Sequence, residues 1–411
     1  MKRVVVTGMG AVTPIGKNID EFWNSIKENR HGFKTITSFD TSRVGISIAA
    51  TIDDFNPENF GIGKKEARRM DRFNQFALAA ARQAVEMSQI QNHMEDPFRI
   101  GVIAGSGIGG FQSIEQEHAK YMEKGPSRVS VFFVPMMISN MAAGTIAMEY
   151  GFKGANIGMV TACATSTHCI GEAFRAIKHG YLDAAVTGGS EAAITEFSMA
   201  GFHNMGALSP STDPDRASIP FDKERSGFVM GEGAAMLVLE EYEHAVRRGA
   251  KIYGEIVGYG ATGDAYHMTS PDPEGSGCAK AMELAIAEAG ITPKEVDYIN
   301  AHGTSTTLND LYETIAIKKA FGSDAQHVAV SSTKSLTGHM LGAAGAVEAL
   351  ACIMALQEGV LPATAGYQVK DEQCDLDYIT EGVRPCNARY AISNSLGFGG
   401  HNGTIAFKKY N

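Results

Sequence analysis

Short runs of β-branched residues alternate along the chain with alanine-rich stretches. This alternation is typical of an α/β protein, in which helices cover the faces of a sheet. Strands are predicted at residues 3–7, 100–104, around 160, 184–187, 233–240, 252–260, 296–300, 328–332, 389–393 and 404–407. Helices are predicted at residues 75–88, 165–179, 242–248 and 277–289.

The order of these elements repeats in the second part of the chain. The matched pairs are residues 75–88 with 277–289, 100–110 with 296–304, 160–179 with 328–346, and 227–240 with 389–407. Such internal similarity is the mark of a duplicated unit. The sequence therefore predicts two duplicated α/β halves, residues 1–250 and 251–411, packed as one body without a flexible linker.

Composition narrows the class of protein. Hydrophobic residues make up 44% and charged residues 20% of 411 residues, which is typical of a globular protein with a large core. No apolar run is expected to reach the roughly eighteen residues of a membrane span, and the N-terminus enters a strand directly, so a cytoplasmic location is expected. Six cysteines without a C-x-x-C pair argue against zinc, and a net charge of −10 argues against a nucleic-acid partner.

Cys163 stands out among the cysteines. It follows a β-branched run, has the small neighbours Ala162 and Ala164, and is predicted to open a helix. The free N–H groups and the dipole of a helix N-terminus favour thiolate over thiol, which suits a nucleophile. The alternative is an inert buried thiol, which is the common state of a cysteine and the one expected for Cys169.

Two histidines occupy turns that match the turn of Cys163. His302 lies between Ala301 and Gly303, ahead of three hydroxyl residues, and His339 follows Thr337-Gly338 before a small-residue helix. Either histidine alone is more often structural than catalytic. At matching turns of a duplicated fold, the two histidines and Cys163 together predict one cleft between the halves.

Four ordered motifs carry a family resemblance. Residues 161–165, 300–306, 331–339 and 393–400 together resemble a β-ketoacyl-acyl-carrier-protein synthase, and the resemblance covers essentially the whole chain. Residues 264–271 are more similar to the type II, long-chain elongating enzymes than to type I. The resemblance implies the thiolase fold, with two duplicated halves in α-β-α-β-α layers.

The resemblance also implies a decarboxylative Claisen condensation. Cys163 would accept an acyl group from acyl carrier protein, and neutral His302 and His339 would stabilise the enolate formed as malonyl carrier loses CO₂. The backbone N–H groups of Cys163 and Phe398 would hold the oxyanion. Lys334 would disfavour protonated imidazole. No cofactor would be required beyond the phosphopantetheine of the carrier.

Further roles follow from the resemblance alone. Thr304 and Thr306 would hold the phosphopantetheine arm, and Phe398 would gate the site. The apolar residues expected along the acyl tunnel are Ile108, Phe133 and Phe202, each of which could equally be ordinary core. The acids expected near Lys334 are Asp310 and Glu313, and Glu348 is a supporting acid that would need a partner in its alanine-rich helix. A structural monovalent cation would lie among Asn300, Ala301, Glu348, Ser393 and Asn394.

The expected partners are acyl carrier protein and a second copy of the chain. Residues 64–72 hold five basic residues in nine, and Lys65, Arg68, Arg69 and Arg72 have the spacing of one helical face. Such a patch can steer an acidic carrier despite the net negative charge. A polyketide ketosynthase and a non-catalytic chain-length subunit remain alternatives, whereas a thiolase would need a second cysteine, which residues 394–400 lack.

Overall fold

A computed structural model describes residues 1–410. Its strands are β1 (Val4–Val12), β2 (Lys34–Thr35), β3 (Ile48–Ala49), β4 (Ile100–Gly105), β5 (Asn156–Ile157), β6 (Ala184–Glu191), β7 (Gly233–Glu241), β8 (Gly254–Gly263), β9 (Tyr298–Asn300), β10 (Ala329–Ser331), β11 (Val360–Leu361), β12 (Asp377–Tyr378), β13 (Arg384–Pro385), β14 (Tyr390–Gly397) and β15 (His401–Lys408). Its α-helices are α1 (Ile19–Lys27), α2 (Lys64–Ala67), α3 (Arg72–Ser88), α4 (Phe111–Lys124), α5 (Phe133–Met137), α6 (Met141–Tyr150), α7 (Thr165–Lys178), α8 (Glu196–Asn204), α9 (Tyr242–Arg247), α10 (Ser276–Ala289), α11 (Thr307–Phe321), α12 (Lys334–Thr337) and α13 (Ala344–Glu358).

The large sheet repeats one strand pattern about its centre. Within the described residues it has eleven strands in the order β12-β10-β9-β14-β15-β8-β1-β7-β6-β4-β5. The central strands β1 and β8 pair antiparallel. On one side β1-β7-β6 is antiparallel and β6-β4-β5 parallel, and on the other side β8-β15-β14 is antiparallel and β14-β9-β10 parallel. The predicted duplication of the α/β fold is thus confirmed, while the boundary at residue 250 stays a prediction.

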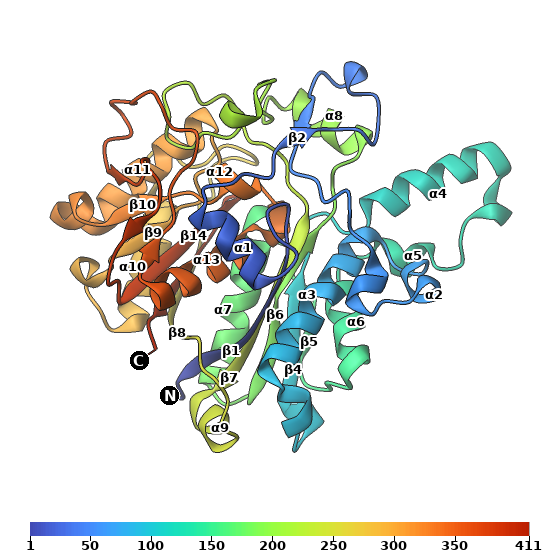
Figure 1. Ribbon diagram of the computed structural model, residues 1–411, viewed down its shortest axis with the longest axis horizontal. Helices are drawn as coiled ribbons and strands as arrows, with labels where there is room; N and C mark the ends of the chain where they lie inside the picture. The colour runs from blue at the N-terminus through green and yellow to red at the C-terminus, as the bar shows by residue number, and fades with distance from the viewer. Residues whose placement is uncertain (411) are drawn as a thin grey trace.

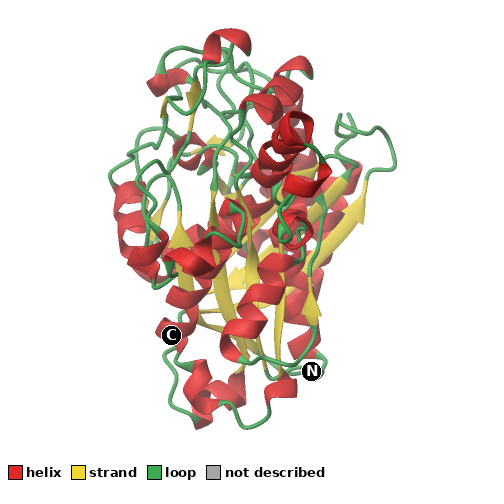
Figure 2. Cartoon of the chain, turned by 90° about the vertical axis from the view of Figure 1, so that its right-hand side faces the viewer, coloured by secondary structure: helices red, strands yellow, loops and turns green. Residues whose placement is uncertain are grey.

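Alternating side chains place helices on both faces of the sheet. In β7, Ala235, Leu237 and Leu239 belong to a core with α7 and α13, whereas Ala234, Met236 and Val238 belong to a second core with α3. Because successive side chains of a strand point to opposite faces, α3 must lie on the face opposite α7. In the other half α13 covers one face and α10 the other. Figure 1 shows α7 and α13 near the centre of the molecule, and Figure 2 shows helices on either side of the strands.

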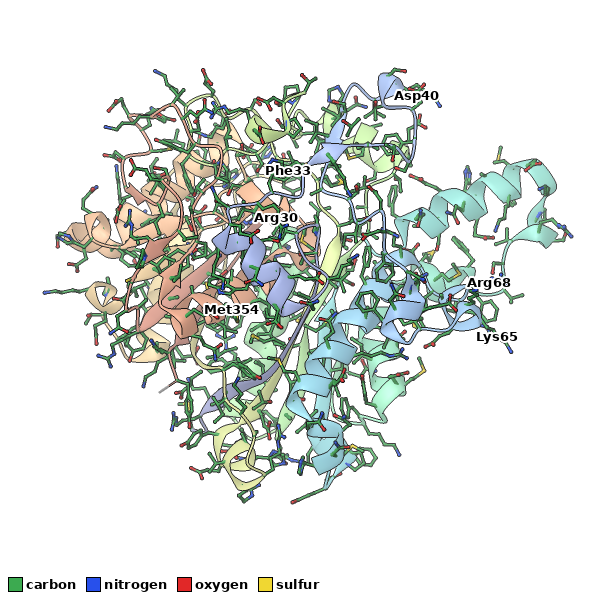
Figure 3. All side chains as sticks on the ribbon, in the orientation of Figure 1. Arg30, Phe33, Asp40, Lys65, Arg68 and Met354 are labelled. Carbon is green, nitrogen blue, oxygen red and sulfur yellow. The ribbon has the colours of Figure 1, made fainter. Side chains whose placement is uncertain are left out.

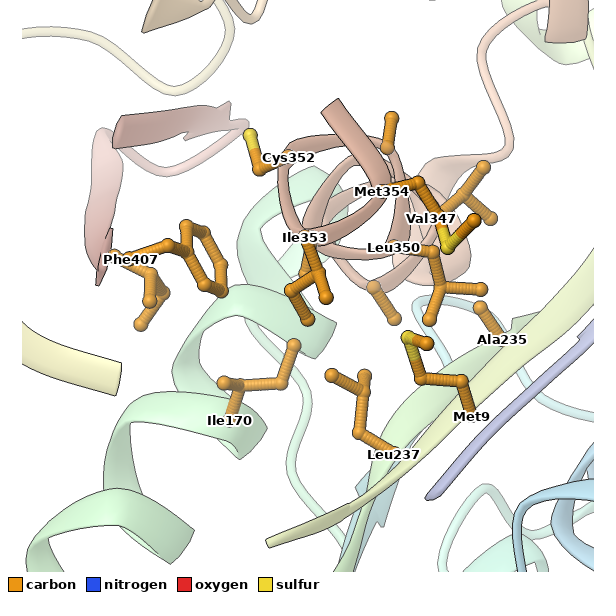
Figure 4. Close-up of a cluster of buried hydrophobic side chains, with 14 of the residues drawn as sticks. Met9, Ile170, Ala235, Leu237, Val347, Leu350, Cys352, Ile353, Met354 and Phe407 are labelled. Atoms are coloured by element: carbon orange, nitrogen blue, oxygen red, sulfur yellow. The ribbon is translucent and has the colours of Figure 1, made fainter. Parts of the chain in front are cut away.

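The enclosed helices form the centre of the hydrophobic core. Ile170 of α7 and Ile353 of α13 pack with Met9, Leu237 and Phe407 from three strands (Figure 4). Burying each such side chain contributes about 1.5–3 kcal/mol. Residues Leu341–Glu358 are long and apolar enough to cross a membrane, but 89% of them are buried inside the protein. The prediction that no segment is this apolar was therefore wrong, because a fully enclosed core helix is apolar all round.

Two local predictions were also wrong. The segment around Val160 is not a strand: only Asn156–Ile157 pairs with β4, and Val160 lies exposed beyond it. Residues 64–72 do not form one helix, because α2 ends at Ala67 and Asp71 caps a separate helix by accepting a hydrogen bond from the N–H of Phe73. Arg72 turns inward to the carboxylate of Glu232.

Candidate active site

A cavity of about 280 Å³ opens where the two halves meet. Cys163, Phe202 and Phe228 line it from the N-terminal half. The C-terminal half contributes His302, Thr304, Thr306, His339 and Phe398 to the same wall. The structure therefore brings the predicted nucleophile, both histidines and both threonines into one space, as expected of a cleft between duplicated units.

Cys163 is presented by a tight turn. It lies in the 3₁₀ turn η6 (Ala162–Ala164), directly before α7. Ala162 has φ 50°, a left-handed conformation that is rare and strained in residues other than glycine. The hydroxyl of Thr165 donates to the carbonyl of Ala162 at 2.7 Å and accepts from the N–H of Thr161 at 2.8 Å, which holds the turn.

The resting thiol of Cys163 is protonated. Burial raises its pKa to about 12, and the charge of Lys334 and the backbone N–H groups of Phe398 and Cys163 lower it by less. The start of the helix was predicted to favour thiolate over thiol. At this buried position desolvation opposes the charged form more strongly, so the thiol is favoured. The backbone N–H groups of Phe398 and Cys163 nevertheless donate hydrogen bonds toward the sulfur.

His302 is fixed from both sides. Its backbone N–H donates to Glu313 Oε1 and that of Gly303 donates to Glu313 Oε2, each at 2.8 Å. Lys334 Nζ donates to the carbonyl of His302 at 2.6 Å and lies 3.3 Å from its Nδ1. Since an ammonium group can only donate, Nδ1 must accept, and the neutral ring carries its hydrogen on Nε2.

His339 lies beside His302 with its ring nearly perpendicular. The ring centroids are 5.3 Å apart at 86°, and the ring of Phe228 packs edge-on at 5.0 Å. The N–H of His339 donates to the carbonyl of Val229 at 2.7 Å, which ties the two halves together. Burial, followed by the charge of Lys334, lowers the pKa of both histidines well below 6.5, so both rings are neutral at pH 7.

Lys334 forms a buried ion pair with Glu348. Both side chains are 2% exposed, and Nζ bonds Glu348 Oε1. Burial raises the pKa of Glu348 to about 7, while Lys334 lowers it. Removing one partner of such a pair leaves an unpaired buried charge, at a cost of about 3–5 kcal/mol.

The two predicted acids of α11 have different surroundings. Glu313 lies under the His302 turn, where burial raises its pKa to about 7 and Lys334 has a lowering effect. Asp310 points instead to Arg225 at 3.8 Å and accepts the backbone N–H of Phe221 at 2.8 Å. Sequence reasoning missed Arg225 and also Glu191, a buried acid among the small residues that end β6; an acidic residue inside such a run was the available signal.

Sequence comparison identifies the family. The profile described as "Beta-ketoacyl synthase, N-terminal domain" matches residues 1–245, and that of the C-terminal domain matches residues 253–368. The chain belongs to the β-ketoacyl synthase family. It is 50% identical over 409 residues to 3-oxoacyl-(acyl-carrier-protein) synthase 2 of Staphylococcus aureus (strain COL), covering 100% of this chain and 99% of the relative.

Solved β-ketoacyl synthases have the same fold. A β-ketoacyl synthase from Burkholderia phymatum STM815 is 34% identical with a TM-score of 0.92. A type II polyketide ketosynthase in complex with its acyl-carrier protein is 32% identical with a TM-score of 0.93. Each comparison covers 100% of both chains, so the thiolase-like fold is confirmed.

The structure separates the expected residues of the acyl tunnel. Phe202 lines the cavity, and Ile108 packs against the apolar cluster that contains Cys163. Phe133 lies outside both, on α5, in the arm formed with α4 at the right of Figure 1. The hydroxyls of Thr304 and Thr306 are 2.9 Å apart at the cavity wall.

The residues expected around a monovalent cation fit such an ion in part. Glu348 Oε2 and Ser393 Oγ are buried without a hydrogen-bond partner among the described residues, and oxygens of both kinds can bind a monovalent cation. Asn394 Oδ1 already accepts from Thr404, and Asn300 bonds Thr333. No cluster of three or more His, Cys, Asp or Glu suited to a metal occurs among residues 1–410.

Proposed function

We propose that this family member elongates acyl chains on acyl carrier protein, condensing an acyl group with malonyl carrier to give β-ketoacyl carrier, CO₂ and free carrier. The observation that carries the proposal is the single cavity that holds Cys163 with two neutral histidines. The 50% identity to a 3-oxoacyl-(acyl-carrier-protein) synthase 2 supports fatty-acid elongation over a polyketide pathway, where the solved ketosynthase is 32% identical.

In the first half-reaction Cys163 receives the acyl group. Its sulfur attacks the thioester carbonyl, and the negative oxygen accepts hydrogen bonds from the N–H groups of Cys163 and Phe398. The carrier thiolate then leaves and takes the proton that the cysteine gives up. Because the resting thiol has a raised pKa, we expect the entering thioester and these donors to stabilise charge only as the bond forms.

In the second half-reaction the histidines act as hydrogen-bond donors. His302 Nε2 and the ring of His339 donate to the thioester oxygen of malonyl carrier and stabilise the enolate left as CO₂ departs. The enolate carbon attacks the acyl-Cys163 carbonyl, and collapse of the adduct releases the sulfur, which regains one proton from water. Lys334 holds His302 in the donating tautomer and opposes its protonation.

We propose two protein partners. Exposed Lys65, Arg68 and Arg69 would dock the acidic carrier; Lys65 and Arg68 project outward in Figure 3. A second copy of the chain would cover the edge strand β5, where Ile157 and neighbouring apolar side chains are exposed. The other exposed apolar residues between positions 131 and 160 are Val131, Phe132, Val134, Met148 and Val160.

We further propose a cytoplasmic location.

We also propose a structural monovalent cation held by Glu348 and Ser393. It would neutralise the negative charge of Glu348 beside Lys334 without entering the reaction. Asn300, Ala301 and Asn394 would complete its shell. Exclusion of potassium and sodium would test the ion through a lower Tm.

A reconstituted reaction tests the function. The purified chain is mixed with acyl carrier and malonyl carrier, and the carriers are weighed by mass spectrometry. We expect a β-ketoacyl carrier two carbons longer than the acyl donor. Malonyl breakdown without any longer product, or transfer only to a small thiol, would refute the proposed function.

A further inference from the structure

The turn that presents Cys163 has a counterpart in the other half. In each half a 3₁₀ turn leads directly into an enclosed helix: η6 precedes α7, and η10 (Leu341–Ala343) precedes α13. Ala162 and Leu341, the first residues of the two turns, have the same left-handed backbone, with φ 50° and 46°. Gly342 therefore holds in the second half the place that Cys163 holds in the first.

A carboxylate fills the space beside Gly342. Glu191 is fully buried at the end of β6 and accepts a hydrogen bond from the N–H of Gly342 at 3.0 Å. A Cβ atom on Gly342 would lie 2.9 Å from Glu191 Oε2 and against the backbone nitrogen of Gly107. The second turn thus has no room for a nucleophilic side chain, and its N–H binds an internal anion where the first turn would bind an oxyanion of the substrate.

The same carboxylate binds the loop after β4. Ser106 Oγ donates to Glu191 Oε1 at 2.8 Å, and the N–H of Ile108 donates to the same oxygen at 3.2 Å. The N–H of Gly107 donates to Oε2 at 2.9 Å. Burial raises the pKa of Glu191 to about 7, and these donors lower it because they favour the ionised form. One side chain therefore ties residues 106–108 to η10.

Both tied segments lie beside the proposed site. Ile108 and Leu341 pack in the apolar cluster that contains Cys163, and His339 lies two residues before Leu341. We propose that Glu191 is a positioning residue of the condensation. It holds the loop of residues 106–108 and the turn η10, next to His339, at a fixed separation. The inference rests on the proposed function, in which Cys163 carries the acyl group and His339 donates to the enolate.

Glu191→Gln tests this role. The amide keeps the shape of the side chain but replaces one acceptor oxygen with a donor, so a buried N–H loses its partner. We expect acyl transfer to Cys163 to slow about tenfold, malonyl decarboxylation only about threefold, and the KM for a long-chain acyl carrier to rise more than that for a medium-chain carrier. Ser106→Ala, which removes one donor and leaves the carboxylate, should shift the chain-length preference in the same direction by about threefold.

Glu240→Gln is the matched control. Glu240 is also a fully buried carboxylate, but it bonds Thr7 and Arg248 away from the cavity, so its variant should lose stability and keep the wild-type ratio of the two half-reactions. Wild-type kinetics in folded Glu191→Gln, or equal losses in both half-reactions, would overturn the role. If that variant does not fold, an unchanged chain-length preference in Ser106→Ala overturns it. Absence of β-ketoacyl product with the wild-type chain would instead refute the proposed function, and this inference with it.

Discussion

The two halves share one scaffold but bring different chemistry to the cavity between them. The N-terminal half contributes the thiol of Cys163 and the apolar rings of Phe202 and Phe228. The C-terminal half contributes His302 and His339, whose neutral rings are set by burial and by a charged lysine behind them. Duplication thus supplies turns that meet at one cavity, and under the proposed function their side chains would divide the reaction into acyl holding and enolate formation.

A second comparison shows where the duplication stops. Glu313 accepts two consecutive backbone N–H groups in the His302 turn, and Glu191 does the same for Gly107 and Ile108 in the other half. The first carboxylate comes from a helix and the second from the end of a strand. Buried N–H groups in both turns need a hydrogen-bond acceptor. The two halves supply that carboxylate from different elements, a helix in one and a strand in the other.

Cys163→Ala should separate the two half-reactions most clearly. Condensation is expected to fall by more than about ten-thousandfold, because no other group can carry the acyl chain. Malonyl decarboxylation should stay within about threefold of wild type, since both histidines remain. Carbon dioxide release and product formation are measured on one sample. Cys169→Ala, which alters a buried cysteine of the core, serves as the control and should still condense.

His302→Ala should have the opposite effect, slowing decarboxylation more than acyl transfer. Loss of one donor to the enolate oxygen is expected to slow decarboxylation by about a hundred- to a thousandfold. Acylation of Cys163, followed by intact-protein mass spectrometry, should slow by less than about tenfold because its oxyanion contacts other donors. The exposed His327 of the same half provides a His→Ala control. Normal decarboxylation in the His302 variant would show that its assigned role is wrong.

Lys334→Met tests whether the lysine acts on chemistry as well as on folding. The variant leaves Glu348 buried and unpaired, so stability should fall by about 3–5 kcal/mol. Decarboxylation should fall by about a hundredfold, because His302 loses the group that fixes its tautomer. Adding Glu348→Gln should restore much of the stability measured by urea unfolding. It should not restore decarboxylation; recovery of both would assign Lys334 a purely structural role.

The pH profile sharpens the same point. The pKa of His302 and His339 lies well below 6.5, so protonation of these two rings should not slow wild-type decarboxylation between about pH 8 and about pH 6. Removing the charge of Lys334 raises both pKa values, and the loss of rate on acidification should begin at a higher pH in Lys334→Met. At His302 and His339 the folded state binds fewer protons than the unfolded chain near pH 6, so the stability that these two residues contribute is lost as pH falls below 6.5. An identical acid limb in both proteins would contradict this account.

Local sequence patterns predicted the duplicated fold and the three residues that meet in the cavity, because strand–helix alternation and turn residues are properties of the chain itself. Effects of tertiary packing were missed. The raised pKa of Cys163 reflects burial by distant segments, and Glu191 reaches the N–H of Gly342 only when the halves meet. Phe133 was expected at the tunnel, but it does not line the cavity within one chain.

The basic run shows how a short polar signal can mislead. Helical spacing placed Arg72 on one face with Lys65, Arg68 and Arg69, but the cap at Asp71 starts a new helix there. Arg72 then pairs with Glu232 inside the protein, while the other three remain exposed. Capping competes with periodicity over such short segments, so the size of a surface patch cannot be counted from spacing alone.

Substitutions in the exposed basic patch, Lys65, Arg68 and Arg69, should have the smallest effect on activity. They should affect both half-reactions and not only one of them. The patch lies on the N-terminal half, yet docking serves both acyl and malonyl carriers. Lys65→Glu/Arg68→Glu is therefore expected to raise the KM for both carriers about three- to tenfold, with kcat nearly unchanged and the defect larger at low salt. Acyl and malonyl pantetheine thioesters, which lack the carrier protein, should react as with wild type. Lys294→Glu, at an exposed position of the other half, controls for net charge. A defect restricted to one carrier, or shared by the small thioesters, would place the patch in the chemistry of one half-reaction instead of in docking.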